Sequence, residues 1–162
     1  MNSSFDKTTG NDEWLTPLEL VNSIGPFDTD PCTPIERPWD TAKVHYNKLD
    51  DGLSKIWKGF IFCNPPYGRE TYKWLEKLAS YNNGIGLIFA RTDTRGFQEQ
   101  VFEKADALFF IKGRIKFCNV EGVAQGPAGA PSCLIAYGQE AVKRLENLSI
   151  NGKIVYLKQK AL

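Results

Sequence analysis

The chain has 162 residues, a formal net charge of +1, 42% hydrophobic residues and 24% charged residues. This composition is typical of one globular domain and excludes a disordered or fibrous chain. No apolar run approaches the roughly 20 residues that cross a bilayer, and the N-terminal residues lack the apolar segment of a secretion signal. We therefore expect a cytoplasmic protein with no membrane partner.

The near-neutral charge gives no global indication of nucleic-acid binding, so any such binding needs a local basic patch. The four cysteines form no C-x-x-C pair, and the chain contains one histidine, His45. We therefore expect no metal site and four free thiols, most of them buried.

In chain order, residues 1–11 read as a flexible leader and residues 12–162 as a single domain. Residues 16–25 predict a short helix, with Thr16 as its cap and Pro17 in its first turn. Later helices are expected over residues 69–83, 93–105 and 140–148. Short apolar runs predict strands at residues 26–30, 42–46, 59–63, 85–90, 107–111, 132–138 and 153–157.

Because strands alternate with helices, we predict an α/β fold with a mainly parallel sheet. Ligands of such sheets bind at the carboxyl ends of the strands. Polar or conformationally restricted residues follow several of these strands, namely Asp30-Pro31-Cys32, Asn64-Pro65-Pro66-Tyr67, Arg91-Thr92-Asp93 and Lys112-Gly113-Arg114.

The stretch "NPPY", Asn64 to Tyr67, directly follows the apolar strand "GFIFC". Two prolines explain why a strand ends, since neither can donate to a ladder, but they do not explain the Asn and the Tyr. In a turn fixed by proline rings, the Asn64 side-chain oxygen and the Pro65 carbonyl can both accept hydrogen bonds from one amino group. This arrangement orients the lone pair of a conjugated amino nitrogen toward an electrophile. The Tyr67 ring can stack on a flat heterocycle extruded from a helix.

The "NPPY" turn resembles the signature of amino-methyltransferases that use S-adenosylmethionine (AdoMet). Over residues 11–138 the chain is similar, more specifically, to the bacteriophage-type DNA N6-adenine methyltransferase family, the phage Dam family. The matching stretches, in that family's order, are "DEWLTP", "DTDPCTP", "DDGL", "FCNPPYG", "ARTDT", "KGRIKF" and "APSCLIAYG".

The resemblance implies a Rossmann-like, AdoMet-dependent methyltransferase with a shortened sheet, acting in a site-specific manner on DNA in the cytoplasm of a bacterial host cell. It implies catalytic roles for Asn64, Pro65, Pro66 and Tyr67. It implies AdoMet contacts for Trp14, Thr16, Pro17, Asp30, Pro31, Cys32 and either Asp50 or Asp51. It implies substrate contacts for Arg91, Asp93, Arg114 and Lys116. The glycine-rich loop of the wider methyltransferase class is replaced by "DPCTP", a departure that phage-type members share.

Several alternatives stay open at this point. The same turn can serve cytosine N4 in DNA, a protein-glutamine methyltransferase, or a DNA- or AdoMet-binding remnant without turnover. Thr16-Pro17 can simply start a helix, Asp30 can be a turn residue and Asp93 a helix cap. Arg114 and Lys116 can be solvated charges on an edge strand. The unpatterned loop over residues 118–131 is the best candidate for DNA sequence recognition. The sequence does not indicate the oligomeric state.

Overall fold

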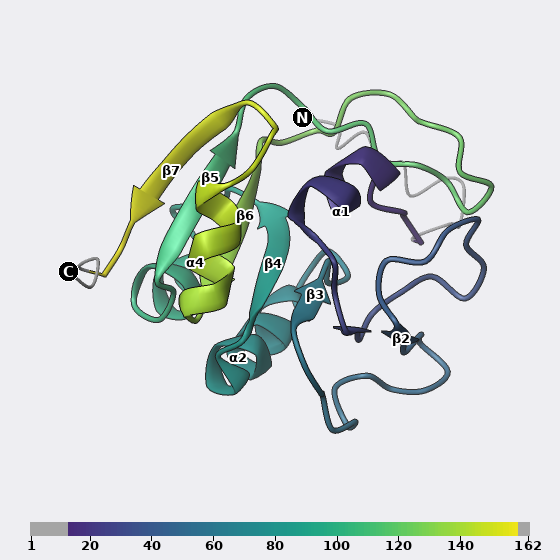
Figure 1. Cartoon of the computed structure of the whole chain (residues 1–162), viewed down its shortest axis with the longest axis horizontal. Helices are drawn as coiled ribbons and strands as arrows, with labels where there is room; N and C mark the ends of the chain where they lie inside the picture. The colour runs from purple at the N-terminus through teal and green to yellow at the C-terminus, as the bar shows by residue number, and fades with distance from the viewer. Residues whose placement is uncertain (1–12, 159–162) are drawn as a thin grey trace.

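The computed structural model describes residues 13–158. The leader expected over residues 1–11 lies outside this range. A seven-stranded sheet in the order β2-β1-β3-β4-β6-β5-β7 forms the centre of the molecule (Figure 1). The strands are β1 (Thr29–Asp30), β2 (Val44–His45), β3 (Ile61–Cys63), β4 (Gly84–Phe89), β5 (Ala107–Ile111), β6 (Ser132–Tyr137) and β7 (Gly152–Tyr156). The helices are α1 (Leu18–Ile24), α2 (Thr71–Tyr81), α3 (Arg95–Phe97), which continues into the π-helical turn η2 (Gln98–Phe102), and α4 (Gln139–Glu146).

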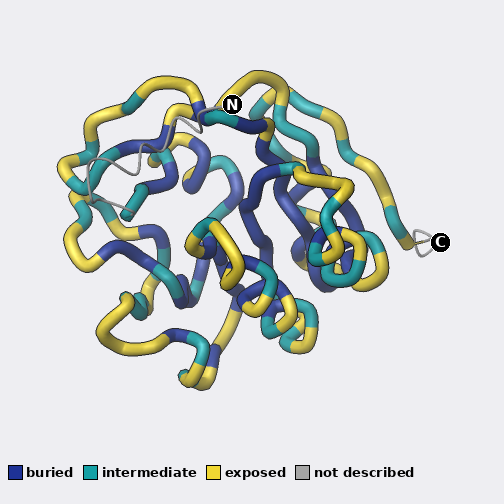
Figure 2. Tube along the Cα trace, turned by 180° about the vertical axis from the view of Figure 1, so that it is seen from behind, coloured by how far each residue is buried: buried dark blue, intermediate teal, exposed yellow. Residues whose placement is uncertain are grey.

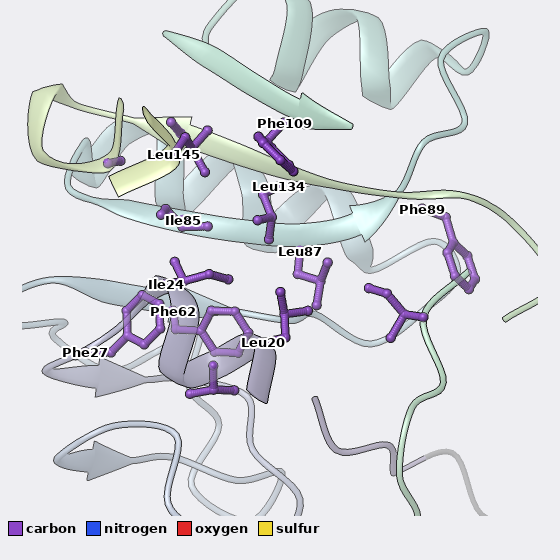
Figure 3. Close-up of a cluster of buried hydrophobic side chains, with 14 of the residues drawn as sticks. Leu20, Ile24, Phe27, Phe62, Ile85, Leu87, Phe89, Phe109, Leu134 and Leu145 are labelled. Atoms are coloured by element: carbon purple, nitrogen blue, oxygen red, sulfur yellow. The ribbon is translucent and has the colours of Figure 1, made fainter. Parts of the chain in front are cut away.

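Apolar side chains on the two faces of the sheet form two cores. One core packs α1 and α4 on the sheet, through residues such as Ile24 and Leu145. The other packs α2 and the α3–η2 segment on the opposite face, through Leu75 and Phe97. Figure 3 shows the first core, in which Phe89 lies apart from Phe27 and the other labelled side chains. The central strands are buried and the peripheral loops are exposed (Figure 2). Because helices cover both faces of the sheet, the chain forms three layers, α/β/α.

The existence and position of the strands agree with the sequence prediction, but the prediction of a mainly parallel sheet is wrong. The pairs β1/β2, β1/β3 and β3/β4 are parallel, whereas β4/β6, β5/β6 and β5/β7 are antiparallel. The longest ladder, β4/β6, is antiparallel over six residue pairs, and the longest parallel ladder, β3/β4, has three. The sheet is therefore mixed, with most of its paired residues in antiparallel ladders.

The physical reason lies in the connection between β5 and β6. A parallel neighbour needs a crossover, usually a helix, but residues 112–131 form a loop without a helix. The loop returns the chain at the edge where β5 ended, so β6 runs in the opposite direction. Every residue of β6 is buried, and an apolar run buried on both faces has the same pattern in either direction.

The pairings place β1, β3, β4 and β5 in one direction. Their carboxyl ends therefore meet at one edge of the sheet, as the sequence predicted, and the polar residues that follow them gather there. The β3 strand ends at this edge because Pro65 and Pro66 cannot extend a ladder. On the far side of the loop that follows β3, α2 begins at Thr71 and ends at Tyr81, and its C-cap residue, Asn82, adopts the left-handed conformation with φ 59°.

Asp30, the last residue of β1, is buried beneath this edge with 3% of its surface exposed. Its carboxylate accepts hydrogen bonds from the Cys32 backbone amide at 3.2 Å and from the Thr41 hydroxyl at 2.5 Å. Burial raises the pKa of Asp30 from 3.8 to about 6, despite the opposing effect of these two hydrogen bonds. Asp30 thus links the loop after β1 to the segment before β2.

Asp30 generates a testable pH dependence of stability. Between pH values of about 4 and 6 the folded state binds more protons at Asp30 than the unfolded state does. This group therefore makes the free energy of unfolding fall as pH rises through that window and stay level above it. The variant Asp30→Asn lacks this titration, so its stability relative to wild type should rise from pH 4 to pH 7 by up to about 3 kcal/mol.

Urea unfolding of wild type and Asp30→Asn across this pH range measures the difference. Asp93→Asn, which changes an exposed aspartate after β4, is the control and should follow wild type. Parallel pH profiles for wild type and Asp30→Asn would contradict the burial of an ionisable Asp30.

Candidate active site

A cleft of about 340 Å³ opens at the carboxyl ends of β1 and β3. Four loop segments line it, namely residues 13–14, residues 31–34, residues 47–48 together with 51–53, and residues 64–67. Glu70 and Trp74, before and within α2, complete the lining. The cleft therefore brings together four of the stretches that the sequence analysis singled out.

The Asn64 side chain has one paired end and one unpaired end. Its Nδ2 donates to the Thr16 hydroxyl at 3.1 Å. Its Oδ1 is buried and has no protein partner within the described part of the chain. Most buried polar atoms in proteins are hydrogen-bonded, and exceptions occur at catalytic sites. Asn64 lines the cleft, so an unsatisfied acceptor lies at its wall.

The three carbonyls of the "NPP" turn are used unequally. The Cys32 thiol donates to the Asn64 carbonyl at 3.1 Å, and the Thr71 hydroxyl donates to the Pro66 carbonyl at 2.6 Å. No donor from residues 13–158 pairs with the Pro65 carbonyl. Two adjacent residues, Asn64 and Pro65, thus each present an acceptor without a protein donor.

Of the three candidate aspartates, only Asp51 lines the cleft. Asp30 is buried beneath it, and Asp50 instead accepts a hydrogen bond from the Asn47 backbone amide at 2.9 Å. Asp51 has a left-handed backbone with φ 54°. A β-carbon on the following residue, Gly52, would lie 1.9 Å from the Pro31 carbonyl oxygen. Only glycine therefore permits the loop after β2 to approach the loop after β1 this closely.

The N-terminal segment differs from its predicted role. Thr16 was expected to cap the first helix, but α1 begins at Leu18, its cap residue is Pro17, and no side chain caps it. The Thr16 hydroxyl pairs with Asn64 instead. Thr16 and Pro17 do not line the cleft, whereas Trp14, Pro31 and Cys32 do.

Aromatic side chains gather beside the turn, toward β4. The Tyr67 ring stacks on the Phe89 ring, with centroids 4.5 Å apart and an interplanar angle of 19°. Phe117 approaches Tyr67 edge-on at 6.4 Å. Burial raises the pKa of the Tyr67 phenol well above its ordinary value, so Tyr67 is neutral at physiological pH.

The four residues predicted on the substrate side are all exposed: Arg91, Asp93, Arg114 and Lys116. None of them lines the cleft. The Arg91 guanidinium lies 5.6 Å from the centroid of the Phe89 ring. Arg114 donates to the Ala128 carbonyl at 3.1 Å. The helix cap next to this region is Thr94, which accepts from the Phe97 amide, so Asp93 is not the cap.

The four cysteines are free, as predicted. The Cys32 and Cys63 sulfurs lie 3.7 Å apart, and burial is the main reason why the pKa of Cys32 is raised. His45 accepts from the backbone amides of Thr41 and Ala42 at 3.1 Å and 3.2 Å, which gives it a structural role. Residues 13–158 contain no cluster of three or more side chains arranged to hold a metal ion. In the same range no helix has the length and apolar character of a membrane span.

Sequence reasoning missed several cleft residues, among them Trp74, Gly52 and Lys48. Trp74 stacks near Trp57 with ring centroids 6.4 Å apart, and it also lines the cleft. Gly52 belongs to the "DDGL" stretch, and a glycine in a loop could have indicated a close backbone approach at this position. Lys48 pairs with Glu13 at 3.7 Å across the cleft, and no local pattern indicates this contact.

Comparison with known protein families gives one match. The model of the family described as DNA N-6-adenine-methyltransferase (Dam) matches residues 3–154. Searches of curated proteins and of solved structures found no match. Because the match covers most of the chain and agrees with the motifs at the sheet edge, the chain belongs to the DNA N-6-adenine-methyltransferase (Dam) family.

Proposed function

We propose that the protein transfers a methyl group from AdoMet to the exocyclic N6 of adenine in DNA, at the turn formed by Asn64, Pro65, Pro66 and Tyr67. One observation carries the proposal. Among residues 13–158 no donor pairs with the Asn64 Oδ1 or the Pro65 carbonyl, two acceptors in adjacent residues of one proline-stiffened turn. An exocyclic amino group has two N–H donors, which is the number that these two acceptors require.

Hydrogen bonds to both acceptors favour a more tetrahedral amino nitrogen and direct its lone pair away from the turn. Because prolines hold the backbone, the acceptors need no reorganisation when charge develops on nitrogen. After methyl transfer the nitrogen is cationic and loses a proton to water or to a neighbouring acceptor. The chain thus contributes orientation and fixed dipoles.

The side chains that line the cleft suit AdoMet in their chemistry. The Asp51 carboxylate can accept from ribose hydroxyls, and the Trp14 and Trp74 rings can pack on the adenosine portion. The close contact between Gly52 and Pro31 keeps the cleft wall free of side chains at that point. When bound, AdoMet supplies the electrophilic methyl group for direct displacement. Thr16, Pro17 and Asp30, for which the family resemblance also implies cofactor contacts, then support the cleft from outside its lining, and of the alternatives Asp50 and Asp51 we assign the cofactor contact to Asp51.

The target base has to leave the duplex, which costs a few kcal/mol. The Tyr67 ring, which stacks on Phe89, is the flat surface to which we assign stacking on the extruded adenine. Arg91, Arg114 and Lys116 are exposed; Arg91 lies against Phe89, and Lys116 precedes Phe117, the two rings that contact Tyr67, so we assign these three side chains to the phosphates. We assign the recognition of a specific DNA sequence to the loop over residues 118–131. We also assign the protein to the Rossmann-like, AdoMet-dependent methyltransferases, and among them to the bacteriophage-type enzymes.

The first prediction concerns Asn64. Tritium transfer from labelled AdoMet to duplex DNA should fall at least about 100-fold in Asn64→Ala, because a preorganised polar contact to the reacting group is lost. Asn22→Ala, which changes an exposed asparagine of α1, should retain wild-type activity. Nucleoside analysis of the product should show N6-methyladenine. Retained transfer in Asn64→Ala would remove Asn64 from catalysis, and N4-methylcytosine would show the wrong base assignment.

A second prediction separates the adjacent aspartates. Asp51→Asn should weaken AdoMet binding about tenfold, the expected effect of losing a charged hydrogen-bond acceptor. Asparagine tolerates the left-handed backbone of this position, so the loop should keep its shape. Asp50→Asn is the matched control and should bind normally, since its amide oxygen can still accept from Asn47. Titration calorimetry measures both, and equal losses would contradict the assignment.

A third prediction concerns DNA. Lys116→Ala should weaken DNA binding and reduce the slope of log affinity against log salt concentration by about 1, as expected for one lost phosphate contact. Lys58→Ala is the control, because Lys58 is exposed and precedes β3 at the opposite edge of the sheet. Fluorescence anisotropy at several salt concentrations gives the slopes. An unchanged slope in Lys116→Ala would place the DNA elsewhere.

A further inference from the structure

The contact between Thr16 and Asn64 joins residues 48 positions apart in the sequence. Thr16 is buried, with 3% of its surface exposed, and its hydroxyl lies 3.1 Å from the Asn64 Nδ2. The hydroxyl does not cap α1, and Thr16 does not line the cleft. Its hydrogen bond to Asn64 therefore has no explanation in helix capping or in cleft lining.

We propose that Thr16 is a positioning residue, which sets the rotation of the Asn64 amide so that Oδ1, and not the NH2 group, faces the target amino group. This inference rests on the function proposed above for Asn64. It gives Thr16 a role in the rate of methyl transfer that is separate from AdoMet binding.

The need for such a residue follows from the shape of an amide. Its oxygen and nitrogen ends are nearly equal in size, and the terminal torsion of Asn is broad and roughly two-fold. The prolines fix the backbone after Asn64 but do not fix this torsion. A half-turn would place an N–H donor against the N–H donors of the substrate. Thr16 supplies an acceptor for the Nδ2 end, and the opposite end, Oδ1, has no partner in the part of the chain that the structure describes.

Thr16 can position another side chain because it is itself held. The preceding residue, Leu15, exchanges two backbone hydrogen bonds of 2.9 Å with Cys118. The Trp39 indole donates to the Thr16 carbonyl at 3.3 Å. Threonine is β-branched and therefore stiff at χ1. These contacts come from segments other than β3, so they fix the hydroxyl independently of the turn.

The test compares Thr16→Val, which keeps the shape and removes the acceptor, with Thr16→Ser, which keeps the hydroxyl. We expect kcat to fall about tenfold or more in Thr16→Val, since small misplacements of reacting groups cost up to about 100-fold. Thr16→Ser should recover most of the rate. The AdoMet Kd, and the fluorescence of DNA with 2-aminopurine at the target position, should stay within about twofold of wild type in both variants.

An unchanged kcat in Thr16→Val would overturn the proposal, and so would a loss confined to the AdoMet Kd, which would make Thr16 a cofactor contact. If Thr16→Val does not fold, Thr16→Ala takes its place. The hydrogen bond can also be measured directly in the wild-type protein, without an activity assay and without a variant of Thr16. By NMR, one proton of the Asn64 side-chain amide, assigned with Asn64→Ala, should be protected from solvent exchange. Rapid exchange of both protons would also overturn the proposal. Absence of methyl transfer in wild type would instead count against the proposed function, and the NMR result would still decide the contact.

Discussion

The site depends on a short turn that cannot relax. Asn64, Pro65 and Pro66 end β3 with two residues that lack backbone N–H groups, and the surrounding chain satisfies only part of the polar atoms there. Cys32 pairs with one carbonyl, Thr71 with another and Thr16 with the side-chain nitrogen. Within residues 13–158 the two acceptors that remain, Asn64 Oδ1 and the Pro65 carbonyl, have no donor. Because an unpaired buried acceptor such as Asn64 Oδ1 is costly, a substrate that donates a hydrogen bond to it offsets that cost.

The order of the strands in the sheet determines which side chains lie on each side of this turn. The loops after β1 and β2 form the cleft, and the segments after β4 and β5 carry the aromatic and basic side chains. β3 lies between β1 and β4, so its turn lies where the two regions meet. On the proposed function, a methyl donor and an extruded base approach the turn from these two different sides. The reversed strand β6 lies between β4 and β5 and begins at this same edge.

Local patterns were sufficient to predict the strands and the position of the turn over residues 64–67. "GFIFC" followed by two prolines allows few alternatives to a buried strand with an abrupt end, and the seven motifs indicate the family, which the family match confirms. The direction of β6 could not be predicted, because burial on both faces removes the alternation that distinguishes strand environments. The pairing of Thr16 with Asn64 could not be predicted either, since helix-start signals around Thr16 explain its side chain locally. Asp30, Asp50 and Asp51 all stand beside turn-forming residues, and only the three-dimensional structure separates the buried, the turn-holding and the cleft-lining carboxylate.

The loop over residues 118–131 is fastened at both ends by main-chain hydrogen bonds. Cys118 pairs with Leu15, and the Pro131 carbonyl accepts from the Ala90 amide at 2.8 Å. Backbone pairing does not depend on side-chain identity, so the intervening residues can change while their anchors stay in place. On the proposed function, target preference and transfer chemistry are therefore separable: the segment that we assign to DNA sequence recognition can change without moving the turn that we assign to catalysis.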